Sequence, residues 1–220
     1  MKWPVDWLSV YRQKDAFWIH DGNPKRPHAL LASGRHSNSF FFNNRITEDP
    51  RLCHEACLSL VELLGKEIDI GKIDRVVGSA PGAIAIAFAT AWHIHQKRKN
   101  GCFFAYTEKE TYVGKSRMFL KDFVLNPRER VLMTEDVVTT GESVHLAEEA
   151  ITAAGGMVFP VVLAFVNRSG LGVIDGKKVI ALVDHPSAEW SPKECPLCKK
   201  GSEAIRPKEH GNWERLNMLS

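Results

Sequence analysis

The sequence lacks any apolar run that approaches the roughly 20 residues a membrane-spanning helix requires. Its first residues, MKWPVDWLSVYRQKDAFW, are interrupted by Pro4 and by charges, which is unlike a secretory signal peptide. The five cysteines, an odd number in 220 residues, do not match the disulfide framework of a secreted protein. We therefore expect a cytoplasmic protein with no membrane partner.

A large excess of charge of one sign is also missing. The 29 Lys and Arg residues against 26 Asp and Glu residues give a formal net charge of +3. Because there is neither a helix-turn-helix pattern nor a concentrated Lys/Arg stripe, no nucleic-acid partner is expected, although a basic pocket for a small anion remains compatible. A hydrophobic content of 44% is typical of a soluble protein with a core of normal size.

Predicted helices and strands alternate from Asp49 onwards. Asp49 and Pro50 are suited to begin a helix that continues to Gly65. Strands are then expected at 73–79, 101–107, 130–134, 157–167 and 177–184, with helices at 83–97 and from about 143 to 155. Because the strands are continuous Val/Ile/Leu runs, they indicate a parallel sheet with helices on both faces, which is an α/β fold. Residues 107–121 are charged and aperiodic, so a loop is expected there.

Two segments flank this predicted core of residues 49–184. Residues 1–48 are rich in Trp, Phe and His and are expected to form short elements and loops. Residues 185–220 are polar and Pro-rich and are expected to form an irregular tail. Ligands bind beyond the carboxyl ends of parallel strands, so the loops at 78–83, 107–121, 135–143 and around Arg168 are expected to lie near one another.

The stretch VLMTEDVVTTGES places Glu135 and Asp136 at the end of an apolar strand, directly before a turn of small residues and a helix. Free amides, the helix dipole and the hydroxyls of that turn suit a phosphate. Carboxylates repel a phosphate, so the two acids suit the vicinal hydroxyls of an attached ribose. An ordinary strand, turn and helix with two solvated acids fits the same residues, since GxxxxGK[ST] and GxGxxG are both absent.

This stretch resembles the phosphoribosyl-diphosphate (PRPP) binding motif of the type I phosphoribosyltransferases, although Thr134 is more polar than the usual residue. The resemblance implies that fold, with residues 1–48 as an N-terminal hood. It also implies that Glu135 and Asp136 hold the ribose hydroxyls. The residues implied around the 5-phosphate are Val138, Thr139, Thr140, Gly141, Glu142 and Ser143.

The segment VVGSAPGAIAIA resembles the pyrophosphate loop of the same family, which implies diphosphate contacts by Ser79, Ala80, Pro81 and Gly82. In relatives this loop often contains a non-proline cis peptide, which we expect at Ser79–Ala80. A plain strand-to-helix connection would explain the glycines alone equally well.

A third segment, SGRHSNSFFFN, is similar to the hood of orotate phosphoribosyltransferases. The similarity implies base contacts by Ser33, Arg35 and the backbone of Phe40 and Phe41. Arg168 matches the position of a family arginine that contacts the orotate carboxylate. Read without the family, the three phenylalanines fit a core strand and a lone arginine fits the surface.

Two residues depart from the family pattern. Ala32 replaces a hood lysine, and Glu108 replaces an arginine before Lys109 and Glu110 in the loop that reaches across a dimer in relatives. Lys115 and Arg117 could supply the lost charge only with different geometry.

The resemblance implies a Mg²⁺-dependent homodimer that transfers the ribose 5-phosphate of PRPP to orotate, giving orotidine 5′-phosphate and diphosphate. Lys109 and Asp136 are the expected catalytic residues, and PRPP is expected to hold most of the Mg²⁺. Transfer to another base, or a non-catalytic PRPP-binding regulator, stays open because of the two departures.

The tail contains Cys195-Pro-Leu-Cys198, which has the spacing of half a structural zinc site. His185 and His210 are available as further ligands. Two reduced thiols in a turn explain the same pair. Cys53 and Cys57, four residues apart on a predicted helix, are expected to be small buried side chains.

Overall fold

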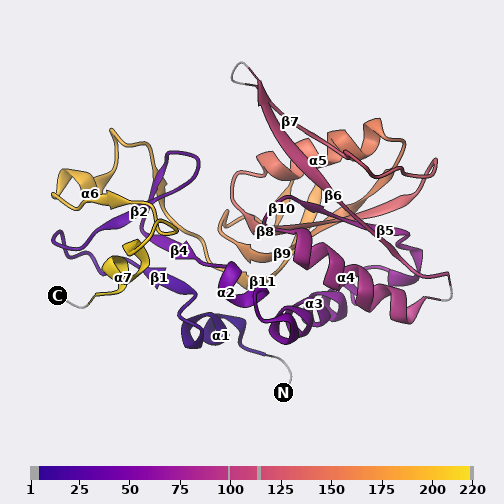
Figure 1. Cartoon of the computed structure of the whole chain (residues 1–220), viewed down its shortest axis with the longest axis horizontal. Coiled ribbons are helices and arrows are strands. Elements are labelled where there is room, and N and C mark those ends of the chain that lie inside the picture. Colours follow the sequence, from indigo (N-terminus) through magenta and orange to yellow (C-terminus); the bar gives the residue numbers. More distant parts are fainter. Residues whose placement is uncertain (1–4, 99, 113–114, 219–220) are drawn as a thin grey trace. The chain divides into compact units, whose positions relative to one another are not determined.

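A computed structural model of the chain describes residues 5–98, 100–112 and 115–218, without the side chains of residues 112 and 115. It divides into two compact units (Figure 1). The larger unit is formed mainly by Ile46–His185, and the smaller one combines Asp6–Arg45 with Pro186–Ser220. The segments that precede and follow the central core in the sequence therefore belong to the same unit.

The larger unit is built on a seven-stranded sheet with the order β10-β11-β9-β8-β5-β6-β7. The five central strands, from β11 to β6, are parallel, and the edge strands β10 and β7 are antiparallel to their neighbours. The strands are β5 (Arg75–Ser79), β6 (Phe103–Tyr112), β7 (Lys115–Phe119), β8 (Arg130–Val138), β9 (Met157–Asn167), β10 (Val173–Ile174) and β11 (Lys177–Asp184). The α/β fold class is confirmed.

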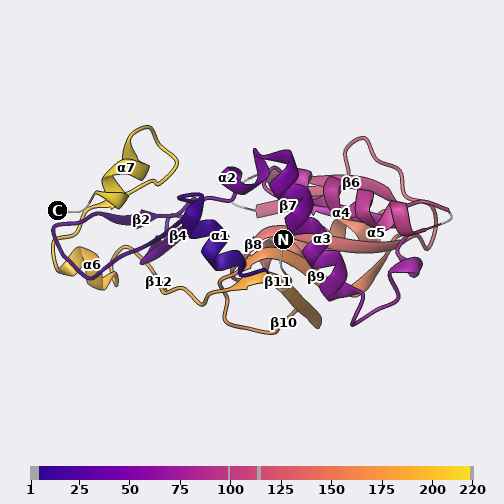
Figure 2. The same ribbon diagram turned by 90° about the horizontal axis from the view of Figure 1, so that it is seen from below.

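Helices cover both faces of this sheet because successive side chains of a strand point to opposite sides. Val77 of β5 is buried in one cluster with Val144 and Ile151 of α5 (Glu142–Ala153). Its neighbour Gly78 lies against Ala87 of α4 (Ile84–Lys97) on the other side. Figures 1 and 2 show α3 (Pro50–Leu64) on the α4 side, opposite α5.

The start of α3 agrees with the capping pattern in the sequence. The Oδ1 atom of Asp49 accepts hydrogen bonds from the backbone N–H groups of Arg51, at 3.1 Å, and Leu52, at 3.2 Å. Pro50 occupies the first turn, where its missing N–H costs no helical hydrogen bond. A short 3₁₀ helix, Ile70–Lys72, then leads into β5.

The smaller unit contains short elements from both ends of the sequence. From the N-terminal segment come α1 (Trp7–Gln13), β1 (Phe17–Ile19), β2 (His28–Leu30), β3 (His36–Ser37) and β4 (Ser39–Phe41). From the tail come β12 (Glu189–Trp190), α6 (Pro196–Lys199), β13 (Ala204–Ile205) and α7 (Asn212–Asn217). A four-stranded sheet, β12-β3-β2-β13, joins the two segments, while β1 pairs with β4. Helix α2 (Asn44–Thr47) spans the boundary between the units.

One apolar cluster of the smaller unit lies on one side of this sheet. Trp18, Ala29 and Leu31 are buried with Ile205 and with Trp213 and Leu216, both of α7. His28 neighbours Ala29 on β2, so its side chain points to the opposite side, where α6 lies. Figures 1 and 2 agree in placing α6 and α7 on opposite sides of β2.

Two local expectations were wrong. Residues 107–121 are largely a β-hairpin, in which Glu108 pairs with Phe119 and Glu110 with Arg117, because backbone pairing needs no apolar periodicity. The cis peptide lies at Ala80–Pro81 rather than Ser79–Ala80, at a proline, where the cis form is least disfavoured. No helix in the described part of the chain is long and apolar enough to cross a membrane.

Candidate functional site: a ribose-phosphate cradle at the strand ends

The carboxyl ends of four neighbouring parallel strands carry the polar residues that the sequence singled out. The backbone N–H of Arg168, just after β9, donates to the Val138 carbonyl of β8 at 2.8 Å. The Ala80 N–H, just after β5, donates to the Thr107 carbonyl of β6 at 2.9 Å. The loops expected to meet at this edge therefore do so within the larger unit.

Glu135 is a buried acid in the middle of this edge, with only 4% of its surface exposed. Burial, followed by the charge of Asp136, raises the pKa of Glu135 to about 8, although a hydrogen bond from the Ser79 hydroxyl acts in the opposite direction. Its Oε1 atom has no hydrogen-bond partner within the described part of the chain. An acceptor buried without a partner is costly, so this atom marks a place where a ligand hydroxyl would be bound favourably.

Asp136 touches the loop that follows β5. A side chain at position 82 would place its first carbon 2.4 Å from Asp136 Oδ2, so any residue other than glycine would displace the Asp136 carboxyl group. The other oxygen, Oδ1, accepts a hydrogen bond from the Val137 N–H at 2.8 Å. The two motifs read separately from the sequence, 79–82 and 135–143, are thus in direct contact at one pair of residues.

The turn after β8 has the conformation of an anion cradle. Gly141 has a φ of 87°, and a first side-chain carbon there would lie 2.3 Å from Ile174 Cγ2. The backbone N–H groups of Thr140, Gly141 and Ser143 have no acceptor within the described residues. They lie at the N-terminus of α5, where the helix dipole adds partial positive charge.

Lys109 reaches this cradle from β6. Its Nζ lies 3.4 Å from Glu142 Oε1 at the first residue of α5, and its charge acts on Glu135. The neighbouring acids point the other way, as strand alternation requires. Glu108 pairs with Lys121 at 3.7 Å, and Glu110 pairs with Arg117 at 2.5 Å.

The position of Arg117 bears on the suggestion that it replaces a lost cation. Arg117 lies directly opposite Glu110 in the hairpin, on the face away from Lys109. It therefore does not add to the charge beside Glu135 within the same chain. The side chain of Lys115 lies outside the described residues.

The hood residues belong to the smaller unit. Ser33 and Arg35 lie in the turn between β2 and β3, and Arg35 donates to the Glu189 carbonyl at 3.1 Å. Phe41 packs its ring on Phe17 at a centroid distance of 4.5 Å, so it is a core side chain, as the reading without the family suggests. Its neighbour Phe40 is half-buried.

The ladder between β1 and β4 decides which backbone groups face outwards. The Phe42 N–H donates to Ala16, and the His20 N–H donates to Asn38, across this pair of strands. Because antiparallel strands alternate bonded and non-bonded positions, Phe40 turns its peptide groups towards β1 and Phe41 turns its own away from β1. This backbone orientation distinguishes Phe41 from Phe40.

A second cluster in the smaller unit brings together His28, His36, Cys195 and Cys198. Their ligand atoms all lie within 4.8 Å of one another. His185 and His210, the partners suggested by the sequence, are not among them, because β2 and β3 are closer to the CxxC turn than either. Only the fold reveals His28 and His36, since both are more than a hundred residues from the cysteines in the sequence.

Comparison with known proteins gives consistent results, although no family model matches the chain. A protein of Heliobacterium modesticaldum called orotate phosphoribosyltransferase is 38% identical over 201 residues, which cover 91% of this chain and 95% of that protein. Proteins of the same name from Acidithiobacillus ferrooxidans and Thermus thermophilus are 32% and 34% identical and cover 89% and 90% of this chain and 95% and 97% of their own.

Solved structures agree at the level of the fold. An orotate phosphoribosyltransferase from Aeropyrum pernix matches with a TM-score of 0.59 and 23% identity over 80% of this chain and 92% of its own. An adenine phosphoribosyltransferase from Thermoanaerobacter pseudethanolicus matches with a TM-score of 0.53 and 18% identity over 66% and 88%. Because sequence identity above 30% extends over both units and the strand-end motifs meet in space, the chain belongs to the orotate phosphoribosyltransferase family.

Proposed function

We propose that this chain transfers the ribose 5-phosphate of PRPP to orotate, forming orotidine 5′-phosphate and diphosphate. The names of its relatives support the substrate. The observation that carries the proposal is the contact of Gly82 with Asp136, beside the unpartnered Oε1 of Glu135. That contact joins a loop suited to a diphosphate to a pair of acids suited to ribose hydroxyls.

In this proposal each part of PRPP has its own set of groups. The ribose hydroxyls bind Glu135 and Asp136. The 5-phosphate binds the turn formed by Val138, Thr139, Thr140, Gly141, Glu142 and Ser143. The diphosphate binds Ser79, Ala80, Pro81, Gly82 and Lys109. Asp136, with one oxygen held by Val137 N–H, is oriented before the ligand arrives.

The reaction is a displacement at the anomeric carbon of the ribose. A ring nitrogen of the base forms the new C–N bond and gives up its N–H proton to solvent, while the C–O bond to diphosphate breaks and its electron pair leaves with the diphosphate. Positive charge develops on the ribose and negative charge on the leaving group. Lys109 stabilises the leaving group, and Asp136 stabilises the ribose cation; preorganised charges of this kind contribute most where new charge develops.

Magnesium is the cation expected with the diphosphate. The phosphate oxygens of PRPP are the hard ligands that Mg²⁺ prefers and would hold most of the ion, with the carboxyl group of Asp136 beside them. When bound, it neutralises part of the charge on the leaving diphosphate.

The base contacts are proposed for Ser33, Arg35, Phe40, Phe41 and Arg168. They rest on the resemblance of SGRHSNSFFFN and of the Arg168 position to the family. The outward-turned backbone of Phe41 supports a pairing role for its peptide groups. A cytoplasmic homodimer completes the proposal, in keeping with the family loop that reaches a neighbouring active site.

Two observations support an alternative function. Ala32 and Glu108 stand where cations are expected, so another base, or PRPP binding without catalysis, remains an alternative. The test is a steady-state assay with PRPP, Mg²⁺ and orotate, uracil, adenine, guanine or hypoxanthine in turn, beside calorimetric titration of PRPP. Turnover with orotate alone supports the proposal. Turnover only with another base would overturn orotate as the substrate. Tight PRPP binding without any turnover would overturn the proposal that the chain is an enzyme.

A further inference from the structure

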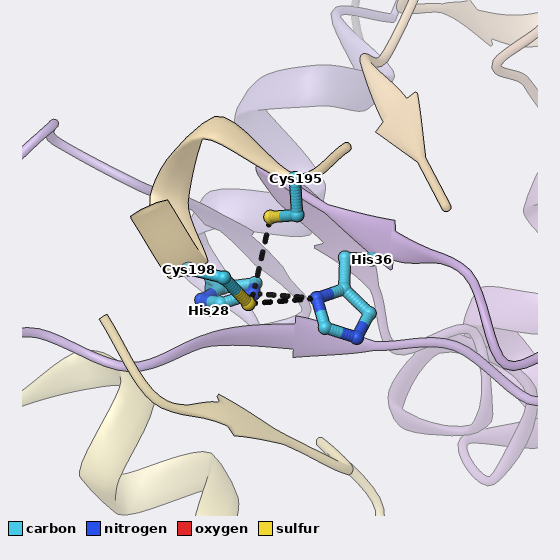
Figure 3. A group of neighbouring side chains, drawn as sticks. All are labelled: His28, His36, Cys195 and Cys198. Atoms are coloured by element: carbon cyan, nitrogen blue, oxygen red, sulfur yellow. Dashed lines mark hydrogen bonds between the residues drawn. The ribbon is translucent and has the colours of Figure 1, made fainter. Parts of the chain in front are cut away.

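The His28, His36, Cys195 and Cys198 cluster (the His/Cys cluster) has no role in the reaction proposed above. His28 and His36 begin β2 and β3, two paired strands of the N-terminal segment. Cys195 caps the N-terminus of α6 and Cys198 lies on that helix, in the tail. All four residues belong to the smaller unit, and Figure 3 shows their side chains directed towards a common centre.

The separations of the ligand atoms match those of a tetrahedral metal site. His28 Nε2 lies 2.9 Å from His36 Nδ1 and 3.5 Å from each of the two sulfur atoms, and Cys198 Sγ lies 3.3 Å from His36 Nδ1. Zinc–nitrogen bonds of about 2.0 Å and zinc–sulfur bonds of about 2.3 Å give tetrahedron edges of roughly 3.3 to 3.8 Å. The three separations above that involve a sulfur atom fall in this range, the two nitrogen atoms lie slightly closer together, and all four ligand atoms lie within 4.8 Å of one another.

A hydrogen-bond chain fixes which nitrogen of His28 faces this centre. The Ser202 hydroxyl donates to the Arg26 carbonyl at 2.6 Å, so its oxygen accepts from His28 Nδ1–H at 2.8 Å. Nε2 of the neutral ring therefore carries a lone pair directed at the cluster. A second polar group that holds the far nitrogen of a histidine is the usual arrangement behind a metal ligand.

Hydrogen bonds alone do not account for the cluster. His36 Nδ1 and both sulfur atoms converge on the single lone pair of His28 Nε2, which can satisfy only one donor well. His28 and Cys195 are fully buried and His36 nearly so, which leaves little water to satisfy the others. A central cation would satisfy all four groups at once.

We propose that His28, His36, Cys195 and Cys198 bind one structural zinc ion that joins the tail to the N-terminal segment. Two nitrogen and two sulfur ligands in a tetrahedron favour zinc among the common divalent metals. Four protein ligands leave no open position, so the site is structural rather than catalytic. The ion connects β2 and β3, on either side of the turn that holds Ser33 and Arg35, to the CxxC turn of α6.

The direct test is the metal content of the purified full-length chain, measured by mass spectrometry after zinc loading and desalting. We expect about one zinc per chain, and cobalt substitution is expected to give thiolate-to-cobalt charge-transfer and tetrahedral d–d absorption. Less than about a tenth of an equivalent of zinc, with no such absorption, would overturn the proposal.

Variants identify the ligands. His36→Ala and Cys198→Ala should lose the zinc, whereas Cys102→Ala, which removes a buried thiol of the larger unit, should keep it. His185→Ala and His210→Ala should also keep it, and loss of zinc in either would overturn this ligand set. Should a variant fail to fold, the cobalt spectrum of the unaltered chain still decides between a site with two thiolates and none.

If the proposed function holds, the zinc site should also affect the reaction. If zinc fixes the turn that holds Ser33 and Arg35, its removal by a chelator should raise the KM for the base more than the KM for PRPP. An equal rise in both would contradict this link without bearing on whether zinc is bound. Failure of the proposed function would appear instead as absent turnover in the zinc-loaded protein.

Discussion

Each of the two units is stabilised internally in a different way. Strands of the larger unit run for up to 11 residues and bury one continuous apolar cluster beneath α5. Strands of the smaller unit have only two or three residues, and the apolar cluster beneath α7 contains six buried side chains. Specific polar links supplement that cluster, such as the bond from Trp18 Nε1 to the Leu216 carbonyl at 2.8 Å.

The difference shows where each unit can tolerate change. The apolar burial of the larger unit supports costly groups at the sheet edge, including Glu135 without a partner for one oxygen. The smaller unit joins two segments that are distant in sequence through short strands, so cross-links between those segments contribute to its stability. Each of the four experiments below changes only one of the two units.

The largest effect is expected from Lys109→Ala, which removes the cation beside Glu135 and Glu142 in the larger unit. We expect kcat to fall by roughly 100- to 1,000-fold, because a preorganised charge on the leaving group is lost. The dissociation constant of PRPP should rise by less than about tenfold, since the cradle and the acids remain. Steady-state kinetics and calorimetry measure the two.

Lys178→Ala is the matched control for that variant. Lys178 is also a half-exposed lysine in an ion pair, with Glu67 at 2.7 Å, but it lies on β11. An equal loss of kcat in both variants would show that the effect comes from general charge and not from the site.

Removal of zinc by a chelator should affect the smaller unit selectively. Amides of β2, β3 and β13 are expected to exchange hydrogen about 100-fold faster or more, because local opening of that unit no longer costs the metal bonds. Amides of β5, β8 and β9 should keep their protection. Hydrogen exchange read by mass spectrometry measures both, and addition of zinc should reverse the change. Equal loss in both units would show that the ion supports the whole chain.

The buried acid gives a pH dependence that belongs to the larger unit. Because the pKa of Glu135 is raised from 4.5 to about 8, the folded state keeps a proton that the unfolded state releases between these values. The carboxyl therefore reduces stability increasingly as pH rises through this range, and it has little effect below about pH 4.5.

Glu135→Gln removes this dependence. We expect the variant to have a higher free energy of unfolding than the unaltered chain. This excess should be roughly 3 kcal/mol larger at pH 8 than at pH 5. Urea denaturation at the two pH values measures it, with the exposed Glu67→Gln as control. The same difference at both values would mean that Glu135 is ionised in the folded protein. The variant is also expected to bind PRPP more weakly, since a ribose acceptor is lost.

The smallest effect is expected from Gly141→Ala in the phosphate cradle. The left-handed backbone costs about 1 kcal/mol for alanine, and the new methyl group would press on Ile174. Gly155→Ala is the matched control, because Gly155 has a φ of 85° with nothing within 4 Å of the added carbon. Thermal melting should show a larger loss for Gly141→Ala, and only that variant should weaken PRPP binding, by about tenfold. Equal effects of the two variants on melting and on PRPP binding would contradict the proposal that this turn binds the 5-phosphate.

The sequence predicted the part of the fold that depends on continuous burial. The runs at 157–167 and 177–184 are β9 and β11 with the same bounds, and the helix that begins after Asp49 is α3. The contact of the 79–82 loop with the acids also followed, because parallel strands that are adjacent end at the same edge.

The remainder depends on contacts that no local pattern encodes. The sequence predicts a loop where β6 and β7 form a hairpin, because the partly polar faces of the hairpin hide the two-residue period. His28 and His36 lie on the two strands of one short hairpin, and their nearness in sequence is the signal that could have suggested a pair of ligands. Their partnership with Cys195 and Cys198 still required the fold, because separation in sequence gives no measure of separation in space.

The composition of the smaller unit has a consequence for the order of events on the ribosome. Its β2 and β3 are synthesised before any strand of the larger unit, but β13, α7 and the two cysteines follow the last strand of that unit. The larger unit can therefore complete its sheet while the nascent smaller unit still lacks half its residues. The four zinc ligands would meet only after Cys198 has left the ribosome, so metal capture would follow synthesis of every strand of the larger unit.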